Sequence, residues 1–102
     1  MIALHRRLQE PRPLVLDGAT GTELARRGFA LSLPLWSAAA LLEAPATLRD
    51  LHAAYVEAGA ELVTANTFRT HERSLAKSGL GGRAAELTRR AVEIARECTG
   101  GR

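Results

Sequence analysis

The sequence has 102 residues, of which 46% are hydrophobic and 25% charged, and its formal net charge is +3. These proportions exclude intrinsic disorder, and the length allows one small domain spanning residues 1–102. The positive charge does not indicate a nucleic-acid partner, because arginines alternate with glutamates as on a solvated helix face and no base-stacking aromatic residues accompany them.

Cys98 is the single cysteine, so no internal disulfide is possible and the composition fits a reducing compartment. We therefore expect a cytoplasmic protein. No stretch approaches the roughly 20 apolar residues that cross a bilayer, and the first ten residues lack the apolar core of a signal peptide. The sequence thus predicts no membrane partner.

The first predicted strand is the apolar run at residues 14–16, which follows Pro11 and Pro13. Continuous apolar runs are typical of parallel strands that are buried on both faces. Asp17 and Gly18 come directly after it, at the C-terminal end of the strand, where α/β folds collect functional residues.

A short helix is predicted next, because Thr20 and Glu23 match a T-x-x-E capping box and Gly28 suits a helix end. After a loop, the stretch at residues 36–44 has helix-forming composition and predicts one or two further turns.

A longer helix should begin at Pro45 and end at Gly59. Its apolar stripe consists of Leu48, Leu51, Tyr55 and Ala58. Residues 61–65 then predict a second strand, with residues 66–70 as the loop at its C-terminal end.

The last predicted helix carries an apolar face and ends at Gly100 and Gly101. That face consists of Ala84, Leu87, Ala91, Ile94, Ala95 and Cys98. The order strand, helix, strand, helix predicts an α/β fold with a parallel sheet. Two parallel strands leave unpaired edges, so we expect either further strands from a longer chain or association between copies.

Asp17 gives the sharpest chemical signal, since a carboxylate at the end of a strand can accept hydrogen bonds from an ammonium group or a cofactor hydroxyl. A helix cap or a loop-stabilising side chain is an equally good interpretation. The following GATGT segment does not match a phosphate-binding loop. Ala19 also stands where an aspartyl phosphatase would carry its second aspartate.

Other polar residues give weaker signals. His71 and Glu72 begin like a zinc-protease motif, but Leu75 occupies the position of the second histidine. Cys98 and His52 are interpreted as packing residues, with a helix-surface position as the alternative for His52.

Three segments in order resemble the opening of the homocysteine S-methyltransferase family, which shares its homocysteine-binding module with betaine-dependent and cobalamin-dependent methionine-forming enzymes. They are LDGATGTELARRG, PLWSAAALLEAP and LHAAYVEAGAELVTANTFRTH. The resemblance covers roughly residues 11–98 and implies the N-terminal part of a (β/α)₈ TIM barrel, about two of its eight strand–helix units.

The resemblance implies methyl transfer from S-methylmethionine or S-adenosylmethionine to the sulfur of homocysteine, giving methionine. It places seven substrate-binding residues at the mouth of the barrel. Asp17 and Gly18 would hold the amino-acid end of homocysteine, Trp36 and Ser37 would shape the pocket, and Asn66, Thr67 and Phe68 would line it. Core packing is the alternative for Trp36 and Phe68.

The family also implies a zinc ion held by three cysteines, whereas Cys98 is the single cysteine in this sequence. We therefore expect no zinc to bind this chain and no catalysis by the chain alone. The alternative hypothesis is a non-catalytic homocysteine-binding or self-associating barrel fragment.

Overall fold

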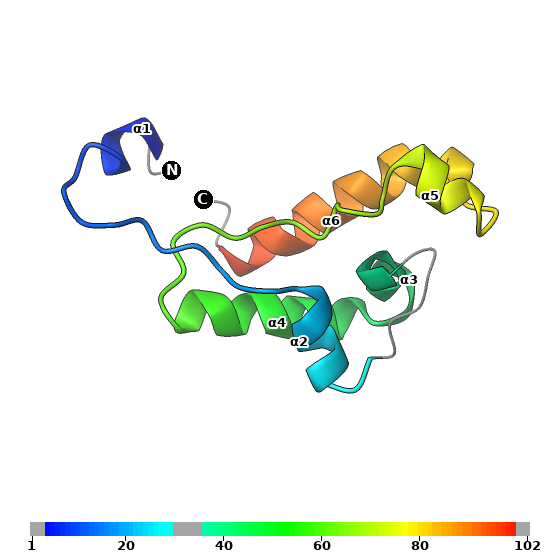
Figure 1. Cartoon of the computed structure of the whole chain (residues 1–102), viewed down its shortest axis with the longest axis horizontal. Coiled ribbons are helices and arrows are strands. Elements are labelled where there is room, and N and C mark those ends of the chain that lie inside the picture. Colours follow the sequence, from blue (N-terminus) through cyan, green and yellow to red (C-terminus); the bar gives the residue numbers. More distant parts are fainter. Residues whose placement is uncertain (1–3, 30–35, 100–102) are drawn as a thin grey trace.

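The computed structural model describes residues 4–29 and 36–99. Regular structure within these ranges is helical (Figure 1). The helices are α1 (Leu4–Arg7), α2 (Gly21–Arg26), α3 (Ala40–Glu43), α4 (Pro45–Glu57), α5 (Glu72–Ala76) and α6 (Ala84–Cys98), with 3₁₀ turns at Trp36–Ala39 and Gly81–Arg83. None of the helices in these two ranges has the length and apolar character needed to cross a membrane.

The two predicted strands meet, but as a single parallel bridge between Leu16 and Leu62. Glu61 N donates to Val15 O at 2.8 Å, and Asp17 N donates to Leu62 O at 3.0 Å. In Figure 1 both extended segments run toward α2 and α5, while α4 and α6 run back in the opposite direction. The predicted element order is therefore present, whereas the prediction of a barrel part stays a prediction.

Burial of the first strand on both faces is wrong for the described chain. Val15 and Leu16 are 49% and 58% exposed, and Leu62 on the second segment is 41% exposed. Within the described residues each segment has only the other as its backbone partner, so apolar side chains remain in contact with solvent.

The core lies between the helices instead. One buried cluster joins α3, α4, α5 and α6, and a smaller one joins α2, α3 and α4. The first consists of Leu41, Leu48, Leu75, Leu87, Ala91 and Ile94, and the second of Leu24, Ala40 and Leu51. The apolar faces predicted for the two long helices are confirmed at these positions. Pro45 is the first residue of α4, as predicted.

Helix ends agree with the sequence at the glycines but not at the predicted capping box. Gly28 and Gly59 follow α2 and α4 with φ of 96° and 117°, a left-handed conformation that glycine adopts without strain. Thr20 has helical backbone angles and its side chain makes no capping bond. Glu23 instead pairs with Arg26, so the capping-box prediction is wrong.

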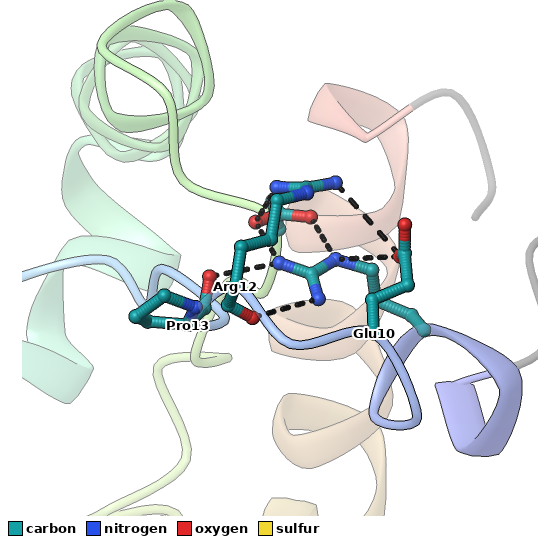
Figure 2. Close-up of polar contacts among 5 residues, drawn as sticks. Glu10, Arg12 and Pro13 are labelled. Carbon is teal, nitrogen blue, oxygen red and sulfur yellow. Dashed lines mark hydrogen bonds and ion pairs between the residues drawn. The ribbon is translucent and has the colours of Figure 1, made fainter.

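The N-terminal segment is attached to the second extended segment through Arg7, which is 7% exposed. Figure 2 shows the polar contacts in this region, which include Glu10, Arg12 and Pro13. Its guanidinium donates to both carboxylate oxygens of Glu61, at 2.7 and 2.9 Å, and to the carbonyl of Pro13 at 2.8 Å. Arg12 Nη1 also contacts Glu61, at 3.2 Å. The hydrogen bonds from Arg7 lower the pKa of Glu61 to about 2. This clamp fixes the start of the second segment at residue 61, whereas residue 66 follows the other end of that segment.

Candidate functional site

Asp17 links the ends of the two extended segments. Its Oδ2 accepts a hydrogen bond from the backbone N of Thr64 at 2.9 Å, and its Oδ1 accepts one from Thr64 Oγ1 at 3.0 Å. Asp17 is therefore not a helix cap. It fixes two segments far apart in sequence, which agrees with the interpretation of a loop-stabilising side chain. An ionised carboxylate has about four acceptor positions, so it retains the capacity to bind an ammonium group as well.

Gly18 lies against the ring of Tyr55 on α4. A Cβ at position 18 would lie 2.8 Å from Tyr55 Oη and 3.0 Å from its Cε1, closer than side chains tolerate. The same hydroxyl donates to the carbonyl oxygen of Ala19 at 2.9 Å. A larger residue here would therefore have to displace the Tyr55 ring, and glycine lets the backbone after Asp17 approach α4 without that shift.

Trp36 and Ser37 begin the 3₁₀ turn before α3, but their side chains lie outside the described part of the structure. Their predicted contribution to a pocket stays a prediction.

The structure describes the other three predicted site residues, which follow Thr64 closely in the chain. Asn66 is 3% exposed, and Thr67 N donates to the carbonyl of Ala65 at 2.8 Å. Phe68 is 77% exposed, so the alternative that this ring packs in the core is wrong. Because Thr64 binds Asp17, the predicted site residues at positions 17–18 and those at positions 66–68 lie at the C-terminal ends of the paired segments.

The turn at residues 67–70 is held against α6. Thr70 donates from its backbone N and from Oγ1 to the carbonyl of Thr67, at 3.3 and 3.2 Å. Its Oγ1 also lies 2.7 Å from Thr88 Oγ1. The turn carries Arg69, whose guanidinium carbon lies 5.4 Å from the centre of the Phe68 ring. No motif in the sequence marks Arg69, although it lies directly beside the predicted site residue Phe68.

His52 is fully buried on α4, which confirms the packing interpretation over a helix-surface position. Neither ring nitrogen has a hydrogen-bond partner among the described residues. Burial lowers the pKa of His52, and the negative charge of Asp17 acts in the opposite direction. A neutral imidazole therefore lies within the electrostatic reach of the candidate site.

His71 has a structural role at the start of α5. Its Nδ1 accepts from the backbone N of Ser74 at 3.3 Å, and its Nε2 lies 3.0 Å from Ser74 Oγ. Since Nδ1 accepts, a neutral ring carries its proton on Nε2 and donates it to the hydroxyl. This is a helix cap and does not activate Ser74 as a nucleophile.

Cys98 also has a structural environment. Its Sγ donates to the carbonyl of Arg49 at 3.3 Å, and burial raises the pKa of the thiol. Across residues 4–29 and 36–99, no group of three or more His, Cys, Asp or Glu side chains is arranged to hold a metal ion. With one cysteine in the sequence, the residues of this chain do not fit a three-cysteine zinc site.

Comparison with known proteins relates this geometry to one family. The family model for homocysteine S-methyltransferase matches residues 14–101. The chain is 40% identical over 90 residues to a selenocysteine methyltransferase from Astragalus bisulcatus, covering 87% of this chain and 27% of that protein. It is 38% identical over 85 residues to the homocysteine S-methyltransferase of Escherichia coli (strain K12), covering 82% and 27%.

A solved structure agrees with both sequence relatives. The crystal structure of the homocysteine methyltransferase MmuM from Escherichia coli, in its metallated form, superposes with a TM-score of 0.87 at 35% identity. The match covers 95% of this chain and 34% of that one, and the chain spans about a quarter of the length of its curated relatives. The family model covers most of the sequence, and the chain belongs to the homocysteine S-methyltransferase family.

Proposed function

We propose that this chain supplies the amino-acid-binding part of a homocysteine S-methyltransferase. The reaction of the whole site is transfer of a methyl group from S-methylmethionine or S-adenosylmethionine to the sulfur of homocysteine, giving methionine. The observation that carries the proposal is the Asp17 carboxylate, held by Thr64 at the C-terminal ends of two parallel segments. The single cysteine favours a reducing compartment, and we place the protein in the cytoplasm.

In this proposal Asp17 accepts hydrogen bonds from the ammonium group of homocysteine. Gly18 would bring the backbone close to the bound amino acid, and the Tyr55 ring would support the backbone at this glycine. Asn66, Thr67 and Phe68 line the site from the second segment. Trp36 and Ser37 shape its outer wall.

We further propose that the chain by itself does not catalyse methyl transfer. The thiol of homocysteine must lose its proton to become a nucleophile, and a bound metal ion is one means of achieving this at neutral pH. The residues of this chain do not fit the zinc site that the family implies. Turnover would therefore require residues that a longer chain or a second polypeptide supplies.

A second candidate function is a homocysteine-binding module that associates with itself or with another part of such a domain. The observation that favours it is the exposed apolar surface at the bridge, formed by Val15, Leu16 and Leu62. Apolar side chains beside unpaired backbone groups favour addition of a further strand. Light scattering of the purified chain across a concentration series separates a monomer from a defined oligomer.

The proposed function is tested by three measurements on the purified chain. Homocysteine titration should show binding to the wild type that is lost in Asp17→Ala. Zinc content and methyl transfer, assayed with each donor, should both be near zero. Stoichiometric zinc with turnover would contradict the proposed dependence on other residues. Absence of homocysteine binding by a folded chain would contradict the proposed substrate site.

A further inference from the structure

Arg69 has an unusual environment among the arginines of the described chain. Its Nε is buried and has no hydrogen-bond partner among the described residues. By contrast, Arg7 and Arg49 donate to carboxylates, at 2.7 and 2.8 Å from Glu61 and Glu97. Leaving a donor of a charged group buried and unpaired is energetically unfavourable. An acceptor that binds at this position would recover that cost.

The position of Arg69 is fixed by its neighbours. Thr70 holds the turn through its bonds to Thr67 and through its contact with Thr88 on α6. The guanidinium lies over the Phe68 ring, within the distance at which a cation and an aromatic face attract. A guanidinium presents its N–H donors in a rigid planar fork, which suits the two oxygens of a carboxylate.

Arg69 and Asp17 also lie at the same end of the fold. Asp17 binds Thr64, and the turn with Arg69 begins three residues later in the chain. An α-amino acid carries one ammonium and one carboxylate group at neutral pH. The Asp17 carboxylate and the Arg69 guanidinium, at the same end of the fold, are complementary to the ammonium and carboxylate groups of such a ligand. The two contacts would also fix the orientation of the ligand.

We propose that Arg69 binds the α-carboxylate of the amino-acid ligand whose ammonium group Asp17 binds. This inference rests on the proposed function, because it assigns one further residue to the same substrate site. Arg69 would therefore determine specificity for amino acids over simple amines. Phe68 would act as the platform that orients the guanidinium.

The test compares two probes by calorimetric titration in a reducing buffer. L-Homocysteine carries the carboxylate, and 3-aminopropane-1-thiol is the same molecule without it. The wild type should bind homocysteine at least about tenfold more tightly than the amine, as expected for one charge-assisted contact. Arg69→Gln should remove that preference and leave the affinity for the amine unchanged. Arg69→Lys should keep part of it, because charge remains but the planar fork is lost.

Arg73→Gln is the matched control, because Arg73 is exposed on the neighbouring helix α5. It should keep the full preference, and circular dichroism should show each variant folded. If Arg69→Gln binds homocysteine with the wild-type preference, the assignment of Arg69 is wrong while the proposed function stands. If the folded wild type binds neither probe, the proposed function fails and this inference fails with it.

Discussion

Asp17 and Thr64 are joined by two hydrogen bonds, one from the backbone N of Thr64 and one from its hydroxyl, at 2.9 and 3.0 Å. The residues are 47 positions apart in the sequence. One carboxylate therefore joins the ends of the paired segments. In the proposed function the same carboxylate also binds the ammonium group of the ligand. A substitution at Asp17 or Thr64 is therefore expected to change both the stability of the fold and the affinity for the ligand, so both quantities have to be measured.

Thr64→Val should lower the free energy of unfolding by about 1 kcal/mol, the usual net value of one hydrogen bond. The substitution removes the hydroxyl donor to Asp17 but keeps the shape of the side chain and the backbone donor. Urea denaturation measures the change. Thr64→Ser, which retains the hydroxyl, should lose less, and equal losses in both variants would argue against the side-chain bond.

Gly18→Ala should destabilise the fold by about 1–3 kcal/mol, because the added methyl group has to displace the Tyr55 ring. The effect should shrink in a Tyr55→Ala background, where the space is free. A double-mutant cycle by denaturation gives the coupling energy between the two positions. Additive effects would show that Gly18 is not required by Tyr55.

The Arg7–Glu61 clamp should make stability depend on acid. The pKa of Glu61 is lowered from 4.5 to about 2 in the folded chain. Its contribution is therefore complete above about pH 4.5 and is lost as the pH falls from there toward 2. The stability difference between wild type and Glu61→Gln should shrink over that window. Glu57→Gln, at an exposed position on α4, serves as the control and should show no such trend.

His52→Leu should raise stability by about 1–2 kcal/mol at neutral pH, because it removes two buried nitrogens that lack partners in the described structure. Burial lowers the pKa of His52 below its ordinary value of 6.5. The unfolded chain therefore binds a proton at this histidine more readily than the folded chain does. The stability contribution linked to this difference is complete above about pH 6.5 and is lost as the pH falls below that value. Thermal unfolding between pH 5 and 8 should therefore show a weaker acid dependence in the variant than in wild type or in His5→Gln.

The sequence predicts the long helices well because their apolar residues recur at helical spacing over several turns. Pro45 and the stripe through Leu48 and Leu51 define α4 without any tertiary information. Helix α5 is not evident from the sequence, because His71 and Glu72 resemble the start of a metal-binding motif. In the structure they are the cap and the first-turn acid of α5. Thr20 failed as a cap because its own backbone is helical.

The candidate site was predictable only in part. The sequence predicts its location at the ends of the two segments, because polar residues come directly after each apolar run. The link from Asp17 to Thr64 and the fit of Tyr55 against Gly18 are tertiary contacts that spacing does not encode. The environment of Arg69 is also a tertiary property. Nothing in the sequence indicates that its Nε is buried and has no hydrogen-bond partner among the described residues.

The proposed amino-acid site is tested best by an NMR titration of the isotopically labelled 102-residue chain with L-homocysteine under reducing conditions. Backbone amide signals of residues 17–18 and 66–69 should shift, while those of Arg7 and Arg12 in the N-terminal segment should not. A folded chain whose shifts were absent, or concentrated around the Arg7–Glu61 clamp, would contradict the claim that this end of the fold binds the amino acid.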